Sequence, residues 1–145
     1  MGARPVMIVV IDSNLLLSAL ISPYGPPAKI YDAWQEGRFR VATCAEQMEE
    51  LRVASRYPRL REILKPHLVG KMMNTLQRAD IFEGFQRKHT ADDPRDAYLL
   101  DLATAAEAQY LLTGDKRSGL LSRHKVGTTK IMTAAAFCRS VLRKD

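Results

Sequence analysis

The chain has 145 residues, of which 46% are hydrophobic and 26% are charged, and this composition is ordinary for one globular domain over residues 1–145. No apolar run is long enough to cross a bilayer, so the sequence excludes a membrane-spanning segment. The 22 Lys and Arg against 16 Asp and Glu give a net charge of +6, which favours a polyanionic partner but does not require one.

The two cysteines, Cys44 and Cys138, have no Cys or His neighbour at metal-ligand spacing. Residues 1–21 contain a basic residue and apolar runs, as a secretory signal does, but Asp12 and Asn14 interrupt the part that would have to be hydrophobic. We therefore expect small buried thiols in a protein of the reducing cytoplasm.

The first two thirds of the chain begin with a strand. Residues 6–11 form a continuous, largely β-branched apolar run, which predicts a strand covered on both faces at the centre of a sheet. Helical periodicity and prolines at helix starts predict the elements that follow. These are helices over 14–21, 27–36 and 45–55, a strand over 38–43, helices starting at Pro58 and at Pro66 (the latter ending near Arg78), and a short strand over 80–85.

The last third alternates helix and strand more clearly. Its pattern predicts a helix over 94–108, a strand over 109–113, a short helix after Asp115, a strand near 130–132 and a final helix. Strands that alternate with helices form right-handed crossovers. We therefore expect an α/β fold in which helices cover both faces of a mainly parallel sheet.

Four short acidic stretches lie along these elements. Asp12 and Asp115 each follow an apolar strand, and the carboxyl ends of parallel strands meet at one edge of a sheet. Asp96 lies in the first turn of a helix that would begin at this edge, and Glu50 can reach it from a neighbouring helix. Like charges held this close repel one another, so four ionised carboxylates need a cation.

Each acid also has a purely structural interpretation, which we favour for any one of them alone. Asp93 before Pro94 has the form of a helix N-cap, and Asp96 three residues later resembles its capping-box partner. Glu50 would be a solvated helix residue. Helix capping would account equally for Asp12, Ser13 and Asp115. The conjunction of four acids, rather than any single one, favours a functional site.

The ligands of such a site are hard oxygens without a convergent Cys or His. This donor set suits Mg²⁺ or Mn²⁺ and argues against structural zinc. A bound divalent ion activates water and neutralises charge on a phosphodiester, so phosphoryl hydrolysis is the chemistry that fits. Asn14 or Thr113 would orient an acid or the attacking water.

The order and spacing of these motifs resemble a PIN domain, and more narrowly the PIN-family toxins of prokaryotic toxin–antitoxin pairs. The resemblance runs from about Met7 to Leu142. The matching pattern is Ile-Asp-Ser-Asn after a strand, Glu-Glu-Leu, Asp-Pro-Arg-Asp-Ala-Tyr-Leu-Leu, Tyr-Leu-Leu-Thr-Gly-Asp, and Thr-Lys-Ile-Met-Thr before an Ala-Ala-Phe helix. It implies a three-layer α/β/α sandwich, a metal-dependent endoribonuclease acting on single-stranded RNA, an antitoxin protein as partner, and a homodimer.

The resemblance also implies roles for individual residues. The residues that match the catalytic and metal-binding acids are Asp12, Glu50, Asp96 and Asp115. Glu50 is preferred over Glu46 and Glu49 because it directly precedes the leucine of the motif. Those that match supporting positions are Asp93, an accessory acid, and Ser13, Asn14 and Thr113, which would hold the carboxylates. Two departures, Cys44 before the second acidic helix and Ala134 where a proline often stands, put local helix capping in doubt.

Two basic runs flank the acids and would guide a phosphate backbone to them. Solvated helix faces explain these runs equally well. Aromatic residues are sparse in the runs, so we expect little readout of RNA sequence, and the three histidines have no convergent partner. The runs contain Arg52, Arg56, Arg59, Arg61 and Lys65, and Lys116, Arg117, Arg123, Lys125 and Lys130.

Two other functions remain open from the sequence. One is a nucleic-acid or protein binding module that keeps the fold and the acids but has little turnover. The other is a DNA nuclease or a phosphatase with the same metal chemistry. Cleavage of matched single-stranded RNA and DNA distinguishes them, because only a reader of RNA gains from the 2′-hydroxyl.

Overall fold

The computed structural model describes residues 7–91, 93–114 and 119–142. Its centre is a six-stranded sheet in the order β3-β2-β1-β4-β6-β5, parallel except for β5. The strands are β1 (Ile8–Ile11), β2 (Arg40–Thr43), β3 (Asp80–Ile81), β4 (Tyr110–Leu112), β5 (Lys125–Val126) and β6 (Thr129–Met132).

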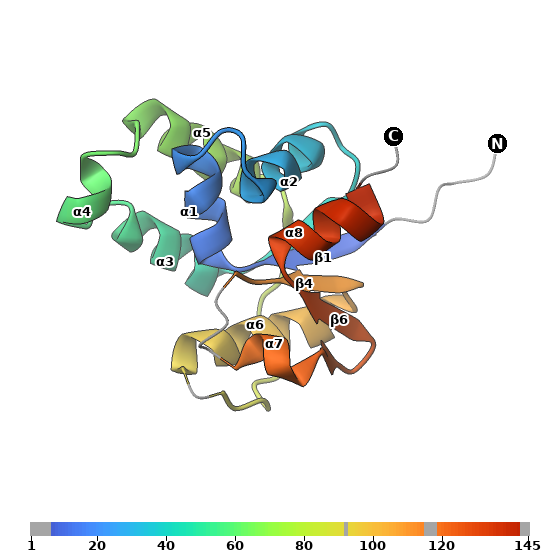
Figure 1. The fold of residues 1–145 in the computed structure, drawn as a ribbon. Coiled ribbons are helices and arrows are strands. Elements are labelled where there is room, and N and C mark those ends of the chain that lie inside the picture. The colour runs from blue at the N-terminus through green and yellow to red at the C-terminus, as the bar shows by residue number, and fades with distance from the viewer. Residues whose placement is uncertain (1–6, 92, 115–118, 143–145) are drawn as a thin grey trace.

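Helices cover both faces of this sheet and give the three-layer α/β/α arrangement (Figure 1). On one side lie α1 (Ser13–Ile21), α2 (Pro26–Gln35), α3 (Ala45–Ala54), α4 (Pro58–Arg61), α5 (Pro66–Gln77) and α8 (Ala134–Phe137), which continues as a π-helical turn, Cys138–Leu142. On the other side lie α6 (Pro94–Ala106) and α7 (Leu120–Arg123). The expected α/β fold with a mainly parallel sheet is confirmed.

Strand β1 lies between β2 and β4 and pairs with both in parallel. Its side chains alternate between two hydrophobic cores: Val9 and Ile11 pack with α1 and α2, whereas Val10 packs with α6. All three side chains are buried, as a central strand requires. The expected strand began at Val6, but β1 begins at Ile8, and Val6 lies outside the described residues.

The aromatic stripe of α2 packs into the first core. Ala28, Tyr31 and Trp34 are all buried, and the Tyr31 and Trp34 rings lie 5.8 Å apart between their centroids. The aromatic stripe of this helix thus forms part of the core.

The end of the chain contains a hairpin that the sequence analysis missed. β5 is only two residues long and pairs antiparallel with β6, with Val126 opposite Thr129. The turn between them needs Gly127, whose φ is +58°. The expected strand over 130–132 is therefore the second half of this hairpin.

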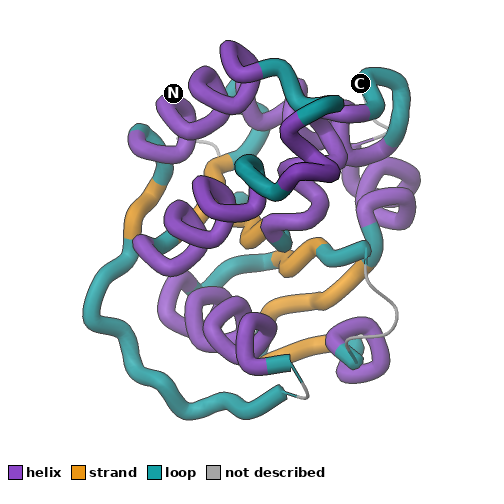
Figure 2. The backbone as a smooth tube through the Cα atoms, turned by 90° about the vertical axis from the view of Figure 1, so that its left-hand side faces the viewer, coloured by secondary structure: helices purple, strands orange, loops and turns teal. Residues whose placement is uncertain are grey.

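A strand and a helix end earlier in the structure than the sequence predicted. The predicted strand over 80–85 ends at Ile81, and Gly84, with φ +63°, belongs to a long loop that leads to α6 (Figure 2). Helix α6 ends at Ala106 rather than at residue 108, because Glu107 adopts the left-handed conformation with φ 51°.

The two departures from the PIN pattern concern the residues at the starts of α3 and α8. Cys44 precedes α3 without a side-chain cap, but its thiol is buried in the second core. Thr133 caps α8 by accepting a 3.0 Å hydrogen bond from the Ala136 N–H, so the last helix does not need a proline at Ala134.

The prediction of two buried thiols holds for Cys44 and is wrong for Cys138, which is only partly buried. None of the helices in the described ranges is both long and apolar enough to span a membrane.

Candidate active site

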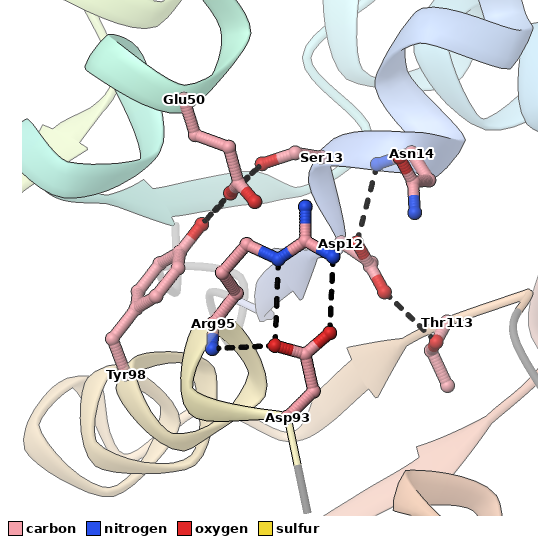
Figure 3. A network of polar contacts seen from close by, with 8 residues as sticks. All are labelled: Asp12, Ser13, Asn14, Glu50, Asp93, Arg95, Tyr98 and Thr113. Carbon is pink, nitrogen blue, oxygen red and sulfur yellow. Dashed lines mark hydrogen bonds and ion pairs between the residues drawn. The ribbon is translucent and has the colours of Figure 1, made fainter. Parts of the chain in front are cut away.

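Asp12 lies directly after β1, where it caps α1. Its Oδ1 accepts a 3.2 Å hydrogen bond from the backbone N–H of Asn14, and its Oδ2 accepts a 2.9 Å hydrogen bond from the hydroxyl of Thr113. Thr113 follows β4, the parallel neighbour of β1, and is fully buried. The carboxyl ends of two adjacent strands thus orient both oxygens of one carboxylate (Figure 3). Asn14 makes its contact with Asp12 through the backbone N–H, whereas the sequence predicted this role for the Asn14 side chain.

Glu50 reaches the same edge of the sheet from α3. Its Oε1 accepts hydrogen bonds from the Ser13 hydroxyl at 2.8 Å and from the Tyr98 hydroxyl at 2.6 Å. Burial, followed by the hydrogen bond to Glu50, raises the pKa of Tyr98 well above its usual range, so the phenol stays protonated and remains a donor. Three helices, α1, α3 and α6, therefore meet at one glutamate (Figure 3).

A buried amide fixes the start of α3 against β1. Gln47 is fully buried, and its Nε2 donates to the Ile11 carbonyl at 2.5 Å and to Ser13 Oγ at 3.4 Å. Its Oε1 accepts a 2.6 Å hydrogen bond from Thr43 at the end of β2. Because the Gln47 side chain can adopt few other positions without leaving buried polar atoms unsatisfied, it sets the place of Glu50 one turn later.

Asp93 caps α6, as its position before Pro94 predicted. Its Oδ1 accepts a 3.0 Å hydrogen bond from the Arg95 backbone N–H. The Arg95 guanidinium adds two contacts, from Nε to Oδ1 at 3.4 Å and from Nη2 to Oδ2 at 3.1 Å. These contacts lower the pKa of Asp93 and raise the pKa of Arg95, so both remain charged. The Arg95 side chain lines the same hollow as Glu50, and in the view of Figure 3 its guanidinium is seen between the carboxylates of Glu50 and Asp12.

Asp96 lies in the first turn of α6, where its N–H donates to the Asp93 carbonyl at 2.9 Å, and the residue is 7% exposed. Within residues 7–91, 93–114 and 119–142, no three Asp, Glu, His or Cys side chains form a group that could hold a metal ion. The fourth predicted acid, Asp115, lies outside the described residues, as do Lys116 and Arg117. The described acids at this edge would offer carboxylate oxygens to an ion, which is donor chemistry that suits Mg²⁺ or Mn²⁺.

Part of the basic run near α3 lines a hollow of its own. Arg52 forms an exposed ion pair with Glu49 at 2.5 Å. Together with Arg56 and Arg61, it lines a separate hollow of about 330 Å³ between α3, α4 and α5. Arg59, also expected to contact nucleic acid, is exposed on α4.

The expectation that the three histidines have no convergent partner is wrong for His89. Its Nδ1 lies 2.6 Å from Oδ1 of the buried Asp101, which also accepts the backbone N–H groups of His89 at 2.9 Å and Lys88 at 3.1 Å. This cluster attaches the loop before Asp93 to the middle of α6.

Three residues at the site were missed from the sequence, namely Gln47, Arg95 and Tyr98. Two of them carried a signal. Gln47 lies four residues before Leu51, on the buried face of α3, where a polar residue needs a partner. A tyrosine in the apolar run of α6 likewise has to satisfy its hydroxyl. Nothing local indicates where the Arg95 guanidinium lies.

A PIN domain family model matches residues 8–117, a span that includes every acid discussed above. The comparisons with curated proteins and with solved structures found no match. The family match covers more than half of the chain and is consistent with the mainly parallel sheet between two layers of helices. The chain therefore belongs to the PIN domain family, and nuclease-type hydrolysis is the chemistry that this membership indicates.

Proposed function

We propose that this PIN domain is a metal-dependent endoribonuclease that hydrolyses phosphodiester bonds of single-stranded RNA and uses Mg²⁺ or Mn²⁺. The observation that carries the proposal is that hydrogen bonds orient the carboxylates of both Asp12 and Glu50. Each carboxylate accepts two hydrogen bonds, from donors on different elements, at the carboxyl edge of the sheet. Such support fixes a ligand in place before its ion binds.

The residues that would hold the ion are Asp12, Glu50, Asp96 and Asp115. When bound, the ion supplies an activated water and neutralises charge on the phosphodiester. Thr113 and the Asn14 N–H hold Asp12 so that its carboxylate keeps one orientation, and Ser13 and Tyr98 do the same for Glu50. Hydrolysis adds water across one P–O bond and leaves a phosphate end and a hydroxyl end.

The test compares cleavage of single-stranded RNA and DNA of the same sequence, with Mg²⁺, with Mn²⁺ and with a chelator. We expect cleavage of RNA that depends on the ion and falls at least about 100-fold in Asp12→Asn. Asp32→Asn is the matched control, because Asp32 is an exposed acid on α2. Circular dichroism and the melting temperature check that both variants fold.

Full activity of Asp12→Asn would contradict the assignment of the site. Equal cleavage of DNA would contradict the preference for RNA. Salt-sensitive RNA binding without cleavage, indifferent to Asp12→Asn, would instead indicate a binding module.

We further infer that the protein is the toxin of a toxin–antitoxin pair, restrained by an antitoxin protein, and that it forms a homodimer. The motif order from Ile11 to the Ala-Ala-Phe helix supports this inference. Expression of the wild type should arrest bacterial growth, expression of Asp12→Asn should not, and a small open reading frame beside the gene should relieve the arrest. Light scattering after size exclusion measures the oligomeric state, and a monomer would contradict the homodimer.

A further inference from the structure

Arg95 belongs to the acidic site. Its helix begins at the carboxyl edge of the sheet, its side chain lines the same hollow as Glu50, and in the view of Figure 3 the guanidinium is seen between the carboxylates of Glu50 and Asp12. Asp93 fixes the guanidinium through Nε and Nη2, and the side chain remains 69% exposed to solvent. A charged group in this position acts on the carboxylates that the proposed ion would need.

Arg95 also lines a hollow of about 420 Å³ that carries three glutamates, Glu46, Glu49 and Glu50. Two of them have their own cations: Glu46 forms an ion pair with Arg87, and Glu49 forms one with Arg52. Glu50 instead accepts hydrogen bonds from two neutral hydroxyls. The positive charge of Arg95 acts on Glu50 and Asp96 as well as on Asp93.

We infer that Arg95 is the built-in counter-cation of the acidic site and competes there with the divalent ion. This inference rests on the proposed function, because it concerns the affinity of the same site for Mg²⁺ or Mn²⁺. The metal-free site needs positive charge because its carboxylates repel one another. Arg95 supplies that charge, and Asp93 keeps it in place.

Two consequences for metal binding follow from Coulomb's law. The guanidinium lowers the negative potential that attracts a cation, and it repels the ion once the ion is bound. Removing the charge should therefore tighten metal binding, by on the order of 10-fold in Kd at low salt for charges separated by several ångströms near the surface. The gain should shrink as added salt screens the interaction.

The experiment titrates the metal-free protein with Mn²⁺ and follows the free ion by electron paramagnetic resonance, so the readout does not depend on activity. The variants are wild type, Arg95→Gln, Arg95→Lys and Asp12→Asn. Arg40→Gln is the matched control, because Arg40 is also an exposed arginine bound through Nε and Nη2 to an aspartate, Asp80, but at the first residue of β2 rather than at the carboxyl edge. Each protein is measured at low and at high salt.

The expected result is a Kd for Mn²⁺ that falls about 10-fold in Arg95→Gln at low salt, stays near the wild-type value in Arg95→Lys and Arg40→Gln, and rises in Asp12→Asn. An unchanged or higher Kd in Arg95→Gln would overturn the inference. So would an equal fall in Arg40→Gln or in Arg95→Lys, because neither change removes charge from the site.

If the proposed function were wrong, the Mn²⁺ titrations would give a different result. If Asp12→Asn bound Mn²⁺ as tightly as the wild type, the ion would not bind at these acids, and both conclusions would fall. Mn²⁺ binding that appeared only in Arg95→Gln and depended on Asp12 would support the counter-cation. The same result would count against metal-dependent catalysis by the wild type.

Discussion

The hydroxyl of Tyr98 on α6 lies 2.6 Å from Oε1 of Glu50 on α3 and donates a hydrogen bond to it. The two residues are 48 positions apart in the sequence and come from opposite helical layers. Ser13 donates to the same oxygen at 2.8 Å. Glu50 therefore depends on both layers for its position.

Tyr98→Phe removes one of these donors and keeps the ring. We expect kcat for RNA cleavage to fall on the order of 10-fold with a smaller change in KM, because the carboxylate is held less firmly. The free energy of unfolding should fall by about 1 kcal/mol, which urea denaturation measures. Tyr110→Phe is the control, because the Tyr110 ring packs against Phe137 at the start of β4. An unchanged kcat in Tyr98→Phe would show that Ser13 alone positions Glu50.

Thr113→Val tests the support of Asp12, since valine has the shape of threonine but cannot donate to Oδ2. Thr113 is fully buried, so we expect a loss of about 1 to 2 kcal/mol in the free energy of unfolding and a fall on the order of 10-fold in kcat. Thr104→Val is the matched control, because the Thr104 hydroxyl bonds only to the Leu100 carbonyl within α6 among the contacts described. If both variants cleaved RNA at the same rate, Thr113 would have no positioning role.

Asp101 should make the stability depend on pH. Burial favours a higher pKa for this carboxyl, but the hydrogen bonds from the His89 ring and from the backbone N–H groups of His89 and Lys88 outweigh it and lower the pKa. A lowered carboxyl pKa contributes stability that is fully present above the unfolded-state pKa of about 3.9 and is lost as pH falls through the lower folded-state pKa. The difference in the free energy of unfolding between the wild type and Asp101→Asn should therefore shrink as the pH falls from the unfolded-state pKa to the folded-state pKa.

Urea denaturation of both proteins between pH 7 and pH 3 measures the difference. We expect Asp101→Asn to be less stable by about 2 kcal/mol at pH 7, and the gap to narrow as the pH approaches 3. Asp32→Asn, at an exposed position, should follow the wild type throughout. A gap that stays constant with pH would mean that the Asp101 charge does not stabilise the loop.

Gly114→Ala tests the position between Thr113, which supports Asp12, and the predicted acid Asp115. A Cβ at Gly114 would lie 3.0 Å from Cδ2 of Leu15, in the first turn of α1. Because Leu15 can shift by a few tenths of an ångström, we expect a modest loss of about 1 kcal/mol together with lower activity. Gly70→Ala, within α5 and without a neighbour within 4 Å, should instead stabilise the protein by about 0.5 to 1 kcal/mol.

Local sequence patterns predicted the parts of the fold that depend on neighbouring residues. The apolar run that ends before Asp12 and the strand predicted over 109–113 have their carboxyl ends at one edge of a parallel sheet, and the structure confirms this edge. The cap that Asp93 forms on α6 was predicted for the same reason, since it involves residues two positions apart.

Contacts between distant elements could not be predicted in the same way. Ser13 and Tyr98 lie 37 and 48 positions from Glu50, and no periodicity links them. The short β5 was not predicted, because two residues are too few to show the alternation of apolar and polar residues that marks a strand. A glycine at the start of a two-residue turn, as in Gly127-Thr128, is nevertheless a known hairpin signal. The direction of the Arg95 side chain depends on Asp93, and thus on a rotamer rather than on a motif.

The hydrogen bonds to Glu50 join a helix above the sheet to a helix below it. Their geometry consequently depends on the thickness of the sandwich at this edge: if α3 and α6 moved apart by one ångström, the bond from Tyr98 would exceed hydrogen-bonding distance. A protein that wedged between these helices would loosen Glu50 without itself contacting the carboxylates of the site.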